Sequence, residues 1–188
     1  MYVLALMGSP HDMGNTATLT QDALDAAAAR GAETKMVRLN ELTIRGCQGC
    51  YGCQRETPCV QQDDMTTLYE EINRADAVLI ASPVYMGYPF TAQTKLFIDR
   101  LFPYIQVLSD RKSRMKPGKR LGLIITQNQP ASDFYRAKVE ELETMLHFLG
   151  FGEGRAMLGA DLGGPTDAAA RQDYREEARH LGEFLAGI

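Results

Sequence analysis

Four short runs of mainly apolar residues and one short alternating run, residues 34–39, recur along the chain, separated by longer stretches in which apolar residues repeat every three or four positions. Short runs bounded by loops are typical of strands in a parallel sheet, and the longer repeats are typical of helices packed by one face. The predicted strands span residues 2–7, 34–39, 77–81, 120–126 and 155–158. The predicted helices span residues 17–30, 64–74, 91–102, 133–149 and 167–185. Residues 40–63 follow neither pattern and are predicted to be irregular.

Because strand and helix alternate five times, the pattern predicts an α/β fold in three layers, a doubly wound five-stranded parallel sheet with right-handed crossovers. We predict the strand order 2-1-3-4-5, in which ligands bind outside the carboxyl ends of the strands, beside the switch point between strands one and three. The 188 residues suit one domain spanning residues 1–188, with residues 40–63 as a cysteine-rich insertion after the second strand.

The loop after the first predicted strand has the composition of a phosphate cradle. Two glycines permit a tight backbone, and hydroxyl and amide side chains lie beside the free N–H groups that begin the next helix. The candidate phosphate-binding residues are Ser9, His11, Gly14, Asn15 and Thr16. The loop fits neither the dinucleotide fingerprint nor the P-loop, so a mononucleotide is the better match. An ordinary strand-to-helix loop with Asn15 or Thr16 as the N-cap is the alternative.

The loop after the third predicted strand is suited to a flat aromatic ring, which needs apolar and aromatic walls. Tyr85 and Tyr88 can supply those walls, and two prolines stiffen the backbone between them. Residues 126–129, at the end of the fourth strand, are a candidate third wall. The glycine-rich segment 163–165 after the fifth strand is either a flap near this site or a plain turn.

Charge and hydropathy exclude several classes of protein. The net charge of -4 and a pI near 5.4 argue against nucleic acid as a partner, because binding its phosphates needs a basic face. No run of 18 apolar residues and no basic segment before an apolar stretch occur, so we predict no membrane span, no secretory signal and a cytoplasmic protein. In that reducing compartment, cysteines are more often metal ligands or redox groups than structural disulfides.

All four cysteines of the chain lie in the irregular segment. They are Cys47, Cys50, Cys53 and Cys59, with glycines interleaved. Three cysteines at i, i+3 and i+6 can wrap a compact metal centre, and this spacing resembles the opening of a ferredoxin motif more than the separated pairs of a zinc site. The fourth comes after five residues instead of a ferredoxin's three. A 4Fe-4S cluster, inert or redox-sensing thiols, and zinc all remain open.

Together these motifs give the chain a resemblance to the flavodoxin-like NAD(P)H-dependent FMN reductases. It rests on Gly-Ser-Pro and Gly-Asn-Thr in the first loop, Ser-Pro-Val-Tyr-Met-Gly in the third and Lys-Leu-Phe-Ile-Asp-Arg after it, and covers most of residues 1–126. Within that superfamily the cysteine spacing and the following Asp63-Asp64-Met65 are most similar to the iron-sulfur flavoproteins.

The resemblance implies that the first loop holds the phosphate of FMN and that the third loop lines the isoalloxazine ring. The residues assigned to the ring are Pro83, Val84, Tyr85, Met86 and Gly87, and Thr126 is added as a contact from the third wall. The family usually carries an arginine where His11 stands, so a charged contact with the phosphate would here depend on pH.

The function that we predict is an FMN oxidoreductase in which the four cysteines hold a 4Fe-4S cluster that passes single electrons. The donor is NAD(P)H or reduced ferredoxin, no side chain need act as acid or base, and the resemblance implies a homodimer or homotetramer in which one subunit's cluster approaches a neighbour's flavin. Two alternatives remain. One is a cluster-free NAD(P)H-dependent reductase of FMN or quinones, and the other is a non-catalytic carrier like flavodoxin.

Overall fold

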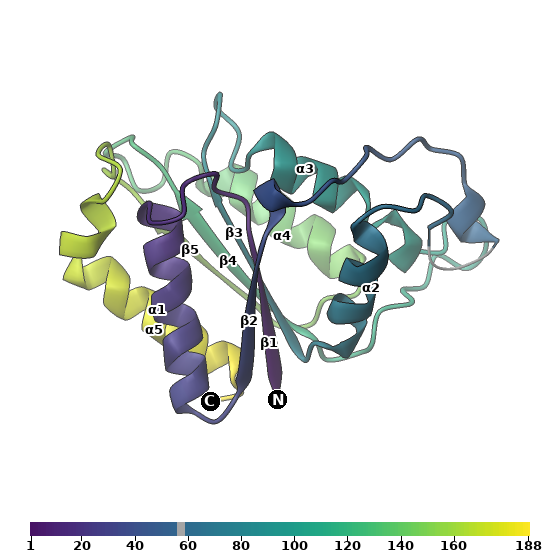
Figure 1. Cartoon of the computed structure of the whole chain (residues 1–188), viewed down its shortest axis with the longest axis horizontal. Helices are drawn as coiled ribbons and strands as arrows, with labels where there is room; N and C mark the ends of the chain where they lie inside the picture. The colour runs from purple at the N-terminus through teal and green to yellow at the C-terminus, as the bar shows by residue number, and fades with distance from the viewer. Residues whose placement is uncertain (56–58) are drawn as a thin grey trace.

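The computed structural model describes residues 1–55 and 59–188 and has a five-stranded parallel sheet at its centre (Figure 1). In spatial order the strands are β2 (Glu33–Arg38), β1 (Tyr2–Met7), β3 (Ala77–Pro83), β4 (Arg120–Thr126) and β5 (Gly154–Gly159). Every pair of neighbours is parallel. The predicted fold class and the order 2-1-3-4-5 are therefore confirmed.

Helices cover both faces of the sheet. One face carries α1 (Asn15–Ala29) and α5 (Gln172–Leu185), and the other carries α2 (Met65–Arg74), α3 (Ala92–Asp99) and α4 (Arg136–Phe148) (Figure 1). Short 3-10 turns occupy Leu39–Glu41, Gly52–Gln54, Phe102–Tyr104 and Asp167–Ala170. The three residues of the cysteine-rich segment numbered 56–58 lie outside the described part of the chain.

Besides the fourth helix, which spans Arg136–Phe148 instead of residues 133–149, two predicted helices are shorter in the structure. The third ends at Asp99 instead of residue 102, since Pro103 has no N–H to donate to the carbonyl of Asp99 and its ring crowds that turn. The last begins at Gln172, after the separate turn over Asp167–Ala170. Neither change moves a predicted site residue.

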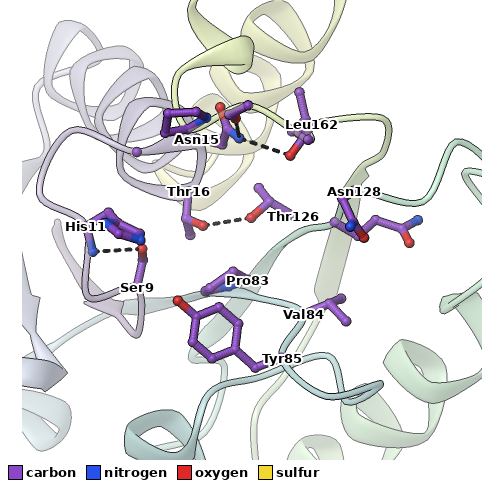
Figure 2. A pocket seen from close by; sticks show the side chains of 15 residues that line it. Ser9, His11, Asn15, Thr16, Pro83, Val84, Tyr85, Thr126, Asn128 and Leu162 are labelled. Atoms are coloured by element: carbon purple, nitrogen blue, oxygen red, sulfur yellow. Dashed lines mark hydrogen bonds between the residues drawn. The ribbon is translucent and has the colours of Figure 1, made fainter.

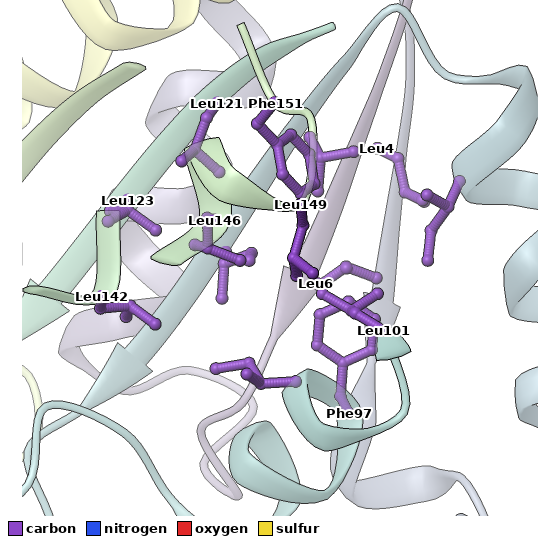
Figure 3. Packing of buried hydrophobic residues seen from close by; sticks show 14 of the residues in the cluster. Leu4, Leu6, Phe97, Leu101, Leu121, Leu123, Leu142, Leu146, Leu149 and Phe151 are labelled. Carbon is purple, nitrogen blue, oxygen red and sulfur yellow. The ribbon is translucent and has the colours of Figure 1, made fainter. Parts of the chain in front are cut away.

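Buried apolar side chains form two clusters, one on each face of the sheet. The larger lies between the sheet and α2, α3 and α4, where Leu4 and Leu6 of β1 meet Phe97 of α3 and Leu146 of α4 (Figure 3). The smaller is rich in alanine and lies under α1 and α5. There Gly182 lets the two helices touch, because a Cβ atom on it would lie 1.9 Å from the carbonyl oxygen of Ala23.

Both termini lie at the end of the sheet opposite the loops that follow β1, β3 and β4 (Figure 1). In the part of the chain that the structure describes, no helix is long and apolar enough to cross a membrane. The loops at the carboxyl ends of the strands are therefore the place to look for a ligand site.

Candidate functional site

A pocket of about 340 Å³ opens at the carboxyl ends of β1, β3 and β4, within the size range of small-molecule sites (Figure 2). Its lining includes nine of the predicted residues, namely Ser9, His11, Gly14, Asn15, Thr16, Pro83, Val84, Tyr85 and Thr126. Gln127, Asn128 and residues 162–165 complete the wall. Of the residues assigned to the cofactor, Met86 and Gly87 are not part of the lining, and Tyr88, predicted as the second aromatic wall, is not part of it either.

On one side of the pocket, the first loop presents the uncapped start of α1. Gly14 is the N-cap, and no side chain of the described chain accepts a hydrogen bond from the first turn. The first N–H groups of a helix have no partner within the helix and carry partial positive charge, so they favour an anion. The Ser9 hydroxyl accepts a hydrogen bond from the backbone N–H of His11 at 3.2 Å, which keeps both residues on the wall.

Two predicted phosphate ligands have side chains that are already committed elsewhere. The Asn15 amide donates to the carbonyls of Leu162 at 3.3 Å and Gly164 at 2.7 Å, and its oxygen accepts from the N–H of Ala168 at 2.8 Å. Asn15 thereby ties the β5–α5 loop to the start of α1. Thr16 and Thr126 share a buried hydrogen bond between their hydroxyls at 2.7 Å (Figure 2). These residues offer a ligand chiefly their backbone groups.

A buried polar network holds the first loop against β3 and α3. Thr91 donates to the carbonyl of Gly8 at 2.8 Å, and its N–H donates to the Ser82 hydroxyl at 2.9 Å. Gly8 fits because it lacks a side chain: a Cβ atom there would lie 1.8 Å from Oγ1 of Thr94. On the outer side, Arg38 donates to the carboxylate of Asp12 at 2.9 Å and fixes the loop to β2.

The third loop forms a small hairpin that carries Tyr85 to the pocket. Tyr85 and Tyr88 exchange two backbone hydrogen bonds of 3.0 Å, and the two residues between them have positive φ angles of 48° and 79°. This is the two-residue turn that matches the twist of a hairpin. The ring of Tyr85 lies along the pocket with its hydroxyl on the Ser9 side (Figure 2), whereas Met86 at the tip is 98% exposed.

The remaining wall comes from the ends of β4 and β5. The N–H of Leu162 donates to the carbonyl of Gln127 at 3.0 Å, so the two loops are held together. The sequence left residues 163–165 as either a flap or a turn near the site; in the structure they line the pocket and are held by Asn15. No local sequence signal indicates this role of Asn15, because its partners lie about 150 residues away.

The four cysteines lie away from this pocket lining, in the segment between β2 and α2. Cys47 and Cys50 are exposed, Cys59 is half-buried and Cys53 is buried. Burial raises the pKa of the Cys53 thiol above its ordinary value; a hydrogen bond from Gln54 opposes this rise, and the other three thiols add to it. Among residues 1–55 and 59–188, no three metal-binding side chains already converge as in a formed metal site.

Asp63 and Asp64 hold the two ends of the cysteine segment together through backbone hydrogen bonds. Asp63 accepts hydrogen bonds from the N–H of Arg45 at 3.0 Å and from the guanidinium of Arg100 at 2.6 Å, and that pair is almost fully buried. Burial by itself would raise the pKa of Asp63, but the hydrogen bonds from Arg100 and Arg45 hold it below the ordinary value. Asp64 accepts from the N–H of Thr43 at 2.6 Å. The Asp-Asp pair therefore has a structural role.

The far end of the segment is fixed to the chain after α3. Gln54 donates to the carbonyl of Ile105 at 2.9 Å and accepts from the N–H of Val107 at 2.9 Å. Arg114 donates to the carbonyl of Cys53 at 2.8 Å. Gln54 also lies 3.8 Å from the Cys53 sulfur, within the range of a weak hydrogen bond. The described parts of the cysteine segment are therefore anchored at both ends.

Comparison with known proteins agrees with this geometry. The model of a family described as NADPH-dependent FMN reductase matches residues 1–138, which carry the first loop, the hairpin and all four cysteines. An iron-sulfur flavoprotein of Methanocaldococcus jannaschii is 29% identical across 100% of this chain and 97% of its own length. One from Archaeoglobus fulgidus is 39% identical over 55% of this chain, a match that reaches 47% of that protein.

Among solved structures, an NAD(P)H:quinone oxidoreductase from Methanothermobacter marburgensis is similar over 100% of this chain and 98% of its own, with a TM-score of 0.77. The two sequences are 16% identical, so the likeness shows the shared fold.

Proposed function

The chain belongs to the NADPH-dependent FMN reductase family, and from this membership we propose that it binds FMN in the pocket at the carboxyl ends of β1, β3 and β4. It is a flavin-dependent oxidoreductase. The observation that carries the proposed binding site is the convergence, in one pocket, of an uncapped helix start, an aromatic hairpin and the ends of β4 and β5. When bound, FMN supplies hydride and single-electron transfer.

In this proposal the phosphate binds to the N–H groups that begin α1, aided by Ser9 and His11, with Gly14, Asn15 and Thr16 providing the backbone. The uncapped first turn supports this assignment. The isoalloxazine ring lies beside Pro83, Val84 and Tyr85 and contacts Thr126, in the part of the pocket with apolar and aromatic walls. Met86 and Gly87 act through the backbone of the turn that carries Tyr85. The protein orients the ring and excludes water from one of its faces.

We further propose that Cys47, Cys50, Cys53 and Cys59 hold a 4Fe-4S cluster, which would relay single electrons. Four thiols suit the chemistry of such a cluster. The anchoring of the segment by Asp63 and Arg114 supports it. Both relatives described above are named iron-sulfur flavoproteins. Reduced ferredoxin and NAD(P)H are the donors that fit this chemistry, and a homodimer or homotetramer would bring the cluster to a neighbour's flavin.

A cluster-free NAD(P)H-dependent reductase of FMN or quinones is the second candidate. The observation that favours it is the separation of the metal-binding side chains in the described residues, where no three converge. In that case the thiols are redox-sensing or inert groups.

Anaerobic absorption spectroscopy, combined with flavin, iron, sulfide and zinc analysis of freshly purified protein, tests both candidates. Flavin bands with about four irons per subunit are expected for the cluster. Flavin without iron or sulfide after anaerobic reconstitution would leave the cluster-free reductase. An absence of FMN binding in a titration would refute the proposed pocket. Sustained NAD(P)H oxidation would identify the physiological class of donor.

A further inference from the structure

The hairpin that carries Tyr85 has a firm root and an exposed tip. At the root, the N–H of Val84 donates to the carbonyl of Thr126 at 2.8 Å, which continues the pairing of β3 with β4. At the tip, Met86 adopts a φ of 48°, a left-handed conformation that is unfavourable for a residue with a side chain. A short two-stranded ribbon is only marginally stable by itself in water. The position of Tyr85 therefore depends on what holds the tip.

Lys138 of α4, about 50 residues further along the chain, contacts the tip of the hairpin. Its ammonium donates to the carbonyl of Gly87 at 2.6 Å. It also lies 5.0 Å from the centre of the Tyr88 ring and 5.6 Å from that of Tyr135, both within the range of a cation–π interaction. In the described part of the chain, no carboxylate lies within ion-pair distance of this ammonium. Two of these three contacts, with Gly87 and Tyr88, are therefore made to the hairpin, and the third is made to the N-cap residue of α4 itself.

We propose that Lys138 is a positioning residue for the flavin: it latches the tip of the hairpin to α4 and so holds Tyr85 against the ring. This inference rests on the proposed FMN site. Lys138 is not part of the pocket lining, so it acts through Tyr85, which does line the pocket. Since the latch acts on the ring and is remote from the uncapped start of α1, it should affect FMN and riboflavin alike.

Lys138 is exposed at the protein surface. Water can therefore compete for its ammonium group, and the contact with the hairpin can break and form again. A charged hydrogen bond and an exposed cation–π contact are together worth at least about a tenfold change in an equilibrium. Release of the tip would free Met86 and Gly87 to leave the strained turn. The hairpin would then sample positions in which Tyr85 no longer lines the pocket.

The test compares Lys138→Met with Lys138→Arg and with Lys95→Met, a matched control on α3 whose ammonium pairs with Asp99 on the surface. Affinities for FMN and for riboflavin are measured by fluorescence titration. Hydrogen exchange of residues 84–90 is measured in the flavin-free protein. We expect Lys138→Met to bind both flavins about tenfold more weakly and to exchange faster in the hairpin. Lys138→Arg should restore both properties, and Lys95→Met should match the wild type.

Unchanged flavin affinity in Lys138→Met would overturn the proposal, as would a loss confined to FMN, which would indicate a direct effect of charge on the phosphate. Failure of the proposed function has a different signature: the wild type would then bind neither flavin, while hydrogen exchange would still report whether Lys138 holds the hairpin. Equal melting temperatures for the two methionine variants would exclude a general loss of stability.

Discussion

Replacing Asn15 with alanine removes three hydrogen bonds that tie the β5–α5 loop to the start of α1. An intramolecular hydrogen bond contributes about 1 kcal/mol net, which gives an upper value of about 3 kcal/mol. Part of this is recovered, because the half-buried Gly164 can turn its carbonyl toward water. We therefore expect the free energy of unfolding to fall by about 2 kcal/mol, and the melting temperature to fall by about 4–8 °C.

The same substitution separates two roles for Asn15. If its side chain holds residues 162–168, then Asn15→Ala loosens one wall of the pocket, and the affinities for FMN and riboflavin fall together. The assays are urea unfolding, hydrogen exchange of residues 162–168 and titration with both flavins. Gln21→Ala is the control, since Gln21 lies on the same helix and makes one exposed bond to Asp25. The reasoning fails if stability is unchanged, or if FMN binding weakens while riboflavin binding does not.

Three further substitutions test the framework around the site. Asp63→Asn should lower the free energy of unfolding by about 3–5 kcal/mol, because it leaves the guanidinium of Arg100 buried without its counter-charge. Hydrogen bonds from Arg100 and Arg45 hold the pKa of Asp63 below its ordinary value, so the wild-type advantage over Asp63→Asn should be present above about pH 4 and be lost as the pH falls through that lowered pKa. Acid unfolding of the two proteins would show this loss. Gly8→Ala should cost at least about 1–3 kcal/mol by overpacking against Thr94, and adding Thr94→Ala should recover part of that loss; a Gly8→Ala protein with the wild-type melting temperature would contradict the close packing. Burial lowers the pKa of Lys119 to about 8 in the folded protein. Between about pH 8 and 10 the unfolded chain therefore binds more protons at Lys119 than the folded protein does, so the free energy of unfolding should rise with pH in this range. The wild type should therefore gain stability relative to Lys119→Met between about pH 7.5 and 9.5. Free energies of unfolding, measured in urea, that change equally with pH in the two proteins would refute this.

The order of elements and the location of the pocket could be predicted from the sequence because both follow from local patterns. The strands over residues 2–7 and 120–126 are found with the predicted bounds, since runs of apolar residues in a buried parallel strand have sharp polar or glycine boundaries. The alternation of strands and helices then restricts the topology, and the topology places the loops after β1 and β3 at one edge of the sheet. Nine of the eleven predicted cofactor-binding residues accordingly line one pocket.

What each side chain does there was decided by tertiary contacts. Asn15 is of a residue type suited to a phosphate ligand or an N-cap, yet its side-chain amide is hydrogen-bonded to a loop about 150 residues away. Lys138 lies in a helix that carries no motif, yet its ammonium reaches the turn at Gly87. Hydrogen-bond partners of this kind are set by the packing of layers that are distant in the sequence, and no spacing rule along the chain encodes them.

The sequence by itself therefore determined the parallel sheet, its strand order and the loops that form the pocket, because periodicity and loop chemistry are local properties. It also supplied the four cysteines. Only the tertiary structure decided that Asp63 and Arg100 close the base of the cysteine segment and that Thr16 pairs with Thr126. It alone placed Met86, which the sequence assigned to the ring together with Tyr85, in solvent. The physical reason is that a side chain's donors and acceptors are assigned only when the folded chain brings their partners within about 3 Å.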